Sequence, residues 1–272
     1  MGHSDIDIEN IVDELKDSKK YSTLCPDTIR NVLQIEAGKH KSLKNAKKSA
    51  RKKLHLILAS YLNELNYSSA EKELESVFSL EDNDKIDETC INIMSKHAST
   101  RERLTSLDEF YSGIFTITGI PKKLADLACA LNPFSFRWMK LPKDTHYYAF
   151  DNNIKIVKLL EMYVRLEGLK ASVEWRDIFL NPPESFFDVA FLFKMYHCLE
   201  HRQRGAGWEI VQKTPARWLA VSFPTRNLAN RKVDIFANYK DTLLNNIKKN
   251  NWDSHLLEFQ SELVLLIKKK TN

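Results

Sequence analysis

Apolar positions in the first 60 residues recur at intervals of three and four, which is the period of an amphipathic helix. The spacing predicts a first helix over residues 8–15, after the start signal Ser4-x-x-Asp7, and a second helix that begins at Pro26. A third helix is predicted to begin near Ser42. Its apolar stripe consists of Leu43, Ala46, Ala50, Leu54, Ile57, Leu58 and Tyr61. Because each helix is short and has one apolar stripe, we expect the three to form a small bundle.

The polar face of the third predicted helix is mainly basic. It carries Lys44, Lys47, Lys48, Arg51, Lys52 and His55, whose spacing places them on one ridge of the helix. From Lys16 to Lys53 the chain has twelve Lys and Arg against three Asp and Glu, a local charge of +9 that leaves −4 for the remainder. Such a block favours a polyanionic partner, and a merely solvated helix face is the alternative interpretation.

Residues 71–90 are acidic, with eight Asp and Glu against two Lys, and predict helices joined by a linker. Ser99-x-x-Glu102 then matches a capping box, which predicts the start of another helix. That helix is expected to bury Leu104, Leu107, Tyr111, Ile114 and Phe115. We therefore predict an all-helical N-terminal region over residues 1–96 and a second domain over residues 97–272.

After Pro121, short apolar runs alternate with helical patterns such as residues 154–166. The predicted strands cover residues 124–129, 146–150, 172–175, 188–193, 218–223 and 263–267. This alternation predicts an α/β fold, a Rossmann-like and mostly parallel sheet with helices on both faces. The last two strands, near residues 256–259 and 262–268, are so close in sequence that we expect an antiparallel hairpin.

Composition narrows the class of protein. No apolar run reaches the ~20 residues of a transmembrane helix, and the acidic first residues lack the apolar segment of a secretion signal. The four cysteines form no C-x-x-C pair, which argues against zinc and against a disulfide framework. We expect a cytoplasmic protein with reduced thiols, no metal and no membrane association.

Acidic residues lie in or directly after the last residues of three successive predicted strands: Asp126, Asp151 and Asp177. In doubly wound sheets ligands bind beyond the carboxyl ends of the strands, and an acidic residue after the second strand commonly binds a ribose diol. Each Asp alone could be a helix cap, but three in register favour a nucleoside site. The chain has neither G-x-G-x-x-G nor a Walker lysine, and only 7 glycines. A nucleoside cofactor without phosphates, such as S-adenosylmethionine, therefore fits better than a phosphorylated one.

Two strings are specific and occur in order, H-A-S-T-R-E-R-L at residues 97–104 and S-F-P-T-R at residues 222–226. Together with residues 19–21, 24–30, 53–55 and 132–133, they resemble the aminoglycoside-resistance 16S rRNA (guanine-N7) methyltransferases. The resemblance runs from about Ser18 to the C-terminus. It implies an S-adenosylmethionine-dependent enzyme that methylates guanine N7 in the decoding region of the 30S ribosomal subunit.

The resemblance also implies roles for single residues. Arg103 would pair with the cofactor carboxylate, a task suited to the bidentate guanidinium. Asp151 would hold the ribose, and Asp177 and Ile178 would flank the adenine. The other cofactor contacts that it implies are Tyr61, His97, Ala98, Ser99, Ala128, Phe193 and Gln203.

For the RNA, we expect contacts to phosphates and to shape rather than to base edges. The cations expected at the RNA are Lys20, Arg30, Lys48, Arg51, Lys52, Arg226 and Arg231. Guanine N7 has a free lone pair at neutral pH, so no proton needs to be removed before attack. We therefore expect no catalytic general base. Catalysis would rest on proximity, in-line orientation and exclusion of water, with the target base flipped out.

Three features depart from the family's pattern. Ala130 stands where the family usually has glycine, so its methyl group would crowd the cofactor or alter the backbone. Residues 230–236 replace a glycine-rich loop, and Gln260 stands where glycine is expected. These departures leave two alternatives open: a non-catalytic or cofactor-impaired RNA-binding protein of the same fold, and a methyltransferase for another RNA or base. We expect a monomer in each case.

Overall fold

The computed structural model describes residues 5–59, 65–225 and 234–270. Tyr61, Arg226 and Arg231, which the sequence places at the cofactor or the RNA, lie outside the described residues. So does most of the departing segment 230–236.

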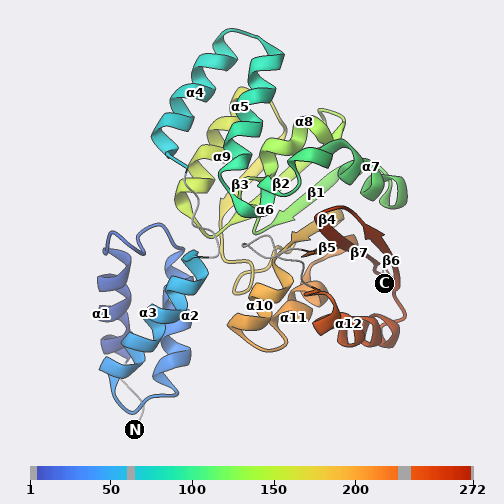
Figure 1. Ribbon diagram of the computed structural model, residues 1–272. Coiled ribbons are helices and arrows are strands. Elements are labelled where there is room, and N and C mark those ends of the chain that lie inside the picture. Colours follow the sequence, from blue (N-terminus) through green and yellow to red (C-terminus); the bar gives the residue numbers. More distant parts are fainter. Residues whose placement is uncertain (1–4, 60–64, 226–233, 271–272) are drawn as a thin grey trace.

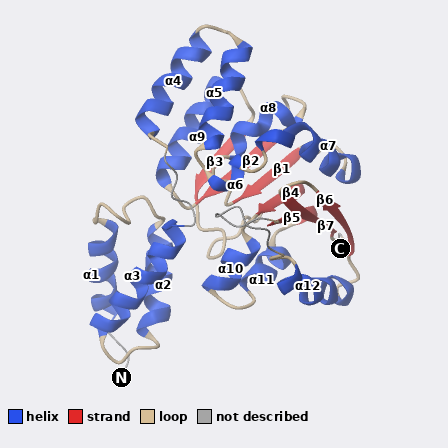
Figure 2. Ribbon diagram, viewed as in Figure 1, coloured by secondary structure: helices blue, strands red, loops and turns tan. Residues whose placement is uncertain are grey.

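A seven-stranded sheet forms the centre of the molecule, in the order β3-β2-β1-β4-β5-β7-β6 (Figure 1, Figure 2). The strands are β1 (Lys123–Leu127), β2 (His146–Asp151), β3 (Ala171–Trp175), β4 (Phe187–Phe193), β5 (Ala216–Pro224), β6 (Asp253–Glu258) and β7 (Glu262–Lys268). The pairs among β1 to β5 are parallel, whereas β7 runs antiparallel to both β5 and β6. The predicted Rossmann-like sheet and its closing hairpin are confirmed.

Helices cover both faces of the sheet because alternate strand residues point to opposite sides. On one face, Leu124, Val189 and Phe191 join a core formed with α7 (Leu107–Thr118), α8 (Phe136–Met139) and α9 (Ile154–Leu166). On the other, Ala125 and Ala190 pack with α10 (Tyr196–Arg202), α11 (Ala206–Lys213) and α12 (Ala237–Lys249). A sheet buried on both faces explains the near-continuous apolar runs of the central strands.

The first three helices form the predicted bundle, with an apolar core of their own. They are α1 (Asp5–Lys16), α2 (Pro26–Ala37) and α3 (Leu43–Ala59), and they lie as a separate group beside the sheet (Figure 1). Leu15, Leu33 and Leu54 are fully buried between them. We call α1 to α3 the N-terminal bundle and the remainder, from α4 to β7, the body.

The next two helices, α4 (Tyr67–Ser79) and α5 (Asn83–Ser95), belong structurally to the body. Leu74, Cys90 and Met94 are buried in the same core as the sheet. Arg137 of α8 adds polar links: it pairs with Asp87 of α5 and donates to Glu167 at 2.7 Å. The acidic helices predicted for residues 71–90 are thus present, and they cover one face of the sheet. A domain boundary at residues 96–97 stays a prediction.

The capping box predicted at Ser99 is wrong. The N-cap of helix α6 (Ala98–Arg101) is His97, two residues before Ser99, and the Ser99 hydroxyl lies 2.7 Å from His97 Nδ1. Glu102 instead accepts a hydrogen bond from Lys194. The chain then passes through the 3-10 turn η1 (Leu104–Ser106) into α7. Of the five apolar residues predicted to be buried, only Leu104 is partly exposed.

Truncated chains would test whether α4 and α5 belong to the body. We expect a chain beginning at Leu65 to unfold cooperatively, because α4 and α5 remain on the sheet. A chain beginning at His97 should lose that cooperative transition, since each buried apolar side chain removed with α4 and α5 contributes roughly 1.5–3 kcal/mol. Thermal unfolding followed by circular dichroism measures both. Equal midpoints for the two chains would show that α4 and α5 do not belong to the body.

Candidate functional site

The carboxyl ends of the parallel strands border a cavity between the body and the N-terminal bundle. Four predicted cofactor residues line it: Ala128 after β1, Asp151 at the end of β2, and Asp177 and Ile178 after β3. The predicted switch-point site therefore gathers at one edge of the sheet.

Asp151 is held in place by the backbone around it. Its Oδ2 accepts a hydrogen bond from the Ala130 amide at 2.9 Å, and its Oδ1 accepts one from the Asn153 amide at 2.8 Å. Burial raises the pKa of Asp151 to about 6, although these amide donors favour the charged form. The carboxylate is thus ionised at neutral pH, and each oxygen retains a lone pair for a further donor.

Asp177 joins the body to the bundle. Its Oδ2 accepts hydrogen bonds from the Thr28 hydroxyl of α2 at 2.7 Å and from Arg202 Nη1 at 2.7 Å. Arg202 Nη2 continues to Asn31 Oδ1 at 2.9 Å, again on α2. The bundle is further attached where the Cys25 amide donates to the Asn152 carbonyl at 2.8 Å. The residue predicted to flank the adenine is therefore also the residue that positions the bundle.

The bundle supplies an apolar wall of the cavity that the sequence interpretation did not assign to the site. Val32 and Ile35 of α2, with Leu56 and Ile57 of α3, line it opposite the strand ends. Leu56 is 66% exposed and contributes to this apolar wall together with its neighbour Ile57. The available signal was Leu56 itself, an apolar residue next to the predicted stripe rather than within it.

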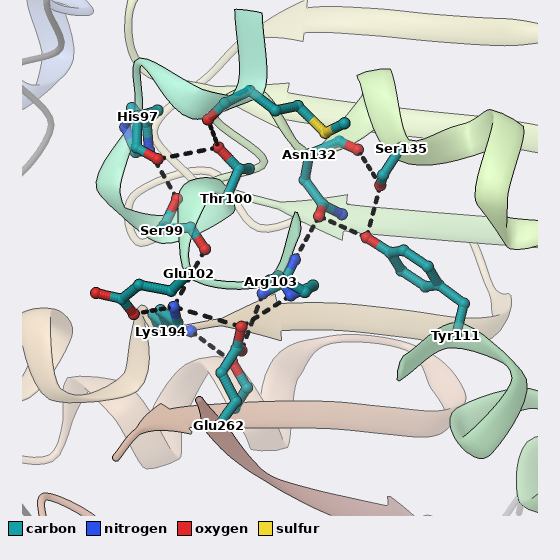
Figure 3. A network of polar contacts seen from close by, with 12 residues as sticks. His97, Ser99, Thr100, Glu102, Arg103, Tyr111, Asn132, Ser135, Lys194 and Glu262 are labelled. Atoms are coloured by element: carbon teal, nitrogen blue, oxygen red, sulfur yellow. Dashed lines mark hydrogen bonds and ion pairs between the residues drawn. The ribbon is translucent and has the colours of Figure 1, made fainter. Parts of the chain in front are cut away.

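A second group of predicted residues lies in a buried polar cluster (Figure 3). Lys194 of this cluster directly precedes Met195, which lines the cavity. The Arg103 side chain is 2% exposed and meets Glu262 through two bonds, Nε–Oε1 at 2.8 Å and Nη2–Oε2 at 2.9 Å. Its Nη1 donates to Asn132 Oδ1 at 2.6 Å. The guanidinium carbon also lies 4.3 and 4.5 Å from the ring centroids of Phe110 and Phe193. Hydrogen bonds therefore fix the guanidinium of Arg103 in its plane, and the two aromatic rings pack against it.

Lys194 links this cluster to the end of β4. Its Nζ donates to Glu102 at 2.5 Å and to the Ser99 carbonyl at 3.2 Å, and lies 3.3 Å from Glu262 Oε1. Burial raises the pKa of Glu262, but the charges of Arg103 and Lys194 outweigh it and lower that pKa to about 2. Burial and the Lys194 charge lower the pKa of His97 to about 4, so His97 is neutral at physiological pH.

The predicted cofactor residues thus fall into two neighbouring groups. His97, Ser99, Arg103 and Phe193 belong to or border the polar cluster, and Ala98 begins the helix α6 beside it. Gln203 differs: it is exposed at the C-cap of α10 and is absent from the described lining of the cavity. Its assignment stays a prediction. Glu102, Lys194 and Glu262 were not predicted as site residues.

Three non-glycine residues around the site have left-handed backbone conformations, namely Ala128 (φ 55°), Ala130 (φ 47°) and Lys194 (φ 54°). Each such residue costs roughly 1–2 kcal/mol. Ala130 keeps the conformation that glycine favours, and its amide reaches Asp151 from there. The departure at Ala130 therefore does not force the backbone out of the left-handed region.

On the bundle, the predicted RNA contacts divide by their partners. Lys20, Lys48, Arg51 and Lys52 are exposed, and Arg51 lies 3.4 Å from Glu14. Arg30 is only partly exposed and is held at 2.7 Å by Glu9. Lys48 and Lys52 are thus the best placed of these side chains to meet an external anion.

Within the described residues, His, Cys, Asp and Glu side chains form no group of three that could hold a metal ion. None of the described helices combines the length and apolar character needed to span a bilayer.

Comparison with known proteins gives consistent similarities over nearly the whole chain. The family model described as "Ribosomal RNA methyltransferase (FmrO)" matches residues 17–266. Two similar relatives are each named 16S rRNA (guanine(1405)-N(7))-methyltransferase. The one from Micromonospora echinospora is 29% identical, over 96% of this chain and 97% of the relative. The one from Proteus mirabilis is 30% identical, over 88% and 89%.

Solved structures give the same result. The 16S rRNA methylase RmtB is 30% identical with a TM-score of 0.79, over 97% of this chain and 98% of that one. The 16S rRNA methyltransferase RmtF, solved in complex with S-adenosyl-L-homocysteine, is 26% identical with a TM-score of 0.83, over 98% and 100%. The similarity therefore includes the N-terminal bundle as well as the sheet.

Proposed function

Because the chain belongs to the FmrO family of ribosomal RNA methyltransferases, we propose that it methylates N7 of guanine 1405 in 16S rRNA, using S-adenosylmethionine. The modification gives aminoglycoside resistance, as the family resemblance implies. The observation that supports the proposal most directly is the gathering of Asp151, Asp177 and Ile178 around one cavity at the carboxyl ends of the strands. The buried Arg103 cluster lies beside them.

The chemistry of the site residues fits S-adenosylmethionine, and so does the sequence in which they would meet its adenine, its ribose and its methionine end. The ionised and buried Asp151 suits the two hydroxyl donors of a ribose, and Asp177 with Ile178 would flank the adenine. The apolar wall from α2 and α3 would exclude water from the base. Arg103 would receive the carboxylate at the other end, with His97, Ala98 and Ser99 beside the methionine chain. When bound, the cofactor supplies an electrophilic methyl group on a sulfonium.

The chain's own contribution to the reaction is positioning. Guanine N7 attacks with a free lone pair, so the site needs no group to remove a proton, and catalysis depends on orientation and exclusion of water. His97 is neutral because its pKa is about 4. A neutral imidazole adds no positive charge beside a sulfonium, which would otherwise oppose cofactor binding.

The substrate would be the 30S ribosomal subunit, reached through the basic face of the bundle. Lys20, Lys48, Arg51 and Lys52 are exposed there, with Arg226 and Arg231 expected to add contacts from the body. We place the protein in the cytoplasm with its ribosomal substrate and expect it to act as a monomer. Sedimentation of the purified protein would measure the second expectation.

Methyl transfer to purified 30S subunits tests the proposed function. Labelled S-adenosylmethionine should deliver label to 16S rRNA, and cleavage chemistry specific for 7-methylguanine should place the mark at position 1405. Label elsewhere in the RNA would favour a methyltransferase of different target. No label, with intact binding of both cofactor and subunit, would favour the non-catalytic alternative. No cofactor binding at high concentration would favour a cofactor-impaired protein.

Asp151 should make cofactor affinity depend on pH. Hydroxyl donors favour the ionised carboxylate, so binding releases a proton near the pKa of about 6 and weakens as the pH falls through it. Between about pH 7.5 and about pH 5 we expect the Kd for S-adenosylhomocysteine to rise roughly tenfold, as measured by calorimetry. In Asp151→Asn the Kd should be higher and nearly flat with pH.

The protein itself should remain folded over that range. A carboxyl whose pKa is raised in the folded state takes up a proton on folding, so its contribution to stability increases as the pH falls through about 6. Burial also raises the pKa of Asp126 to about 6, so its contribution to stability changes with pH in the same direction.

A wild-type Kd for S-adenosylhomocysteine that does not change with pH would show that Asp151 does not contact the ribose.

Charge reversal on the bundle should weaken subunit binding and leave cofactor binding intact. For the triple change Lys48→Glu, Arg51→Glu and Lys52→Glu we expect at least roughly tenfold weaker 30S binding at moderate salt, because phosphate contacts dominate such affinity. Filter binding measures it. The matched control reverses three exposed lysines of α12, Lys240, Lys248 and Lys249. Equal losses in the two triple variants would show that α3 makes no specific contribution.

A further inference from the structure

Glu262 is a buried carboxylate to which nothing above assigns a functional role. It is the first residue of β7 and lies 159 residues from Arg103 in the sequence. In the sheet it is opposite Pro224, at the carboxyl end of β5, so it faces the same edge as the cofactor residues. Its side chain is 0% exposed.

We propose that Glu262 is a positioning residue, which orients Arg103 for the carboxylate of the cofactor and balances its charge. The inference rests on the proposed function, since it assumes S-adenosylmethionine in the site. It adds the closing hairpin of the sheet to the machinery that selects the amino-acid end of that cofactor.

The geometry supports orientation. Glu262 binds Arg103 through Nε and Nη2, and Asn132 binds it through Nη1 (Figure 3). A guanidinium has five N–H donors, two of them on each Nη atom. These three bonds, together with the rings of Phe110 and Phe193, fix the plane of the group. They leave one further N–H on each Nη, and the Tyr111 hydroxyl is also a partner of the guanidinium. An incoming carboxylate therefore meets donors whose direction is already set.

The charges support the second part of the role. Arg103 and Lys194 are both buried cations, and Glu102 and Glu262 bring their joint charge to zero. Removal of the Glu262 charge would leave this cluster positive. S-adenosylmethionine carries a sulfonium and an ammonium besides its carboxylate, so a positive cluster would repel most of the ligand's charge. Glu262 thus allows Arg103 to attract the carboxylate without opposing the remainder of the cofactor.

Two ligands separate this role from a purely structural one. S-adenosylhomocysteine has the amino-acid end, whereas 5′-methylthioadenosine has the same nucleoside and thioether but lacks both the carboxylate and the ammonium. In Glu262→Gln we expect roughly tenfold or greater loss of affinity for S-adenosylhomocysteine, and less than about twofold change for methylthioadenosine. Calorimetry on the full chain measures both affinities. Glu258→Gln makes the same chemical change at an exposed position of β6 and should alter neither.

Equal losses for the two ligands, or no loss for either, would overturn the inference. If Glu262→Gln does not fold, Glu262→Asp decides, because it keeps the charge but shortens the reach to Arg103. It should reduce the preference for S-adenosylhomocysteine, and a wild-type preference would overturn the role. A wild-type protein that binds neither ligand would contradict the proposed function itself, whereas wild-type binding with unchanged preference in the variants would contradict only the role of Glu262.

Discussion

The ion pair between Arg103 and Glu262 is the constraint around which the site is built. Transfer of either charge from water into the protein interior costs several kcal/mol, so neither residue can be buried without the other. Their pairing requires the segment after α6, the end of β4 and the start of β7 to meet at one point. Arg103 and Glu102 both turn toward that point, which explains why the helix does not continue from α6 into α7. The interrupted helix in turn presents His97 and Ser99 at the cluster.

One helix of the bundle serves two surfaces. On α3, Lys48 and Lys52 point to solvent, whereas Leu56 and Ile57, one turn further on, line the cavity. The bundle is attached to the body by the bonds from Thr28 and Arg202 to Asp177, and Asp177 itself lines the same cavity. A ligand that fills the cavity would therefore touch the elements that hold the bundle in place.

The sequence predicts the architecture well because architecture follows from local periodicity. Strand alternation, the closing hairpin and the three-helix bundle all appear where apolar spacing predicts them. The capping box at Ser99 failed because its two members have other partners: Ser99 bonds to the neighbouring His97, and Glu102 to the distant Lys194. Glu262 was missed for a similar reason: its partner is 159 residues away, and no local pattern reports such a pairing. Family resemblance located Arg103 but not the carboxylate that holds it.

The scarcity of glycine is reflected in the turns at the edge of the sheet that borders the cavity. Turns that need a left-handed residue are usually made by glycine, yet here Ala128, Ala130 and Lys194 adopt that conformation. Tertiary hydrogen bonds replace the missing conformational freedom: the Ala130 amide donates to Asp151, and the Lys194 amide donates to Ser222. One of these strained turns is thus held by Asp151, which also lines the cavity. A left-handed alanine or lysine costs roughly 1–2 kcal/mol more than a glycine would, so these turns persist only because the surrounding hydrogen bonds hold them.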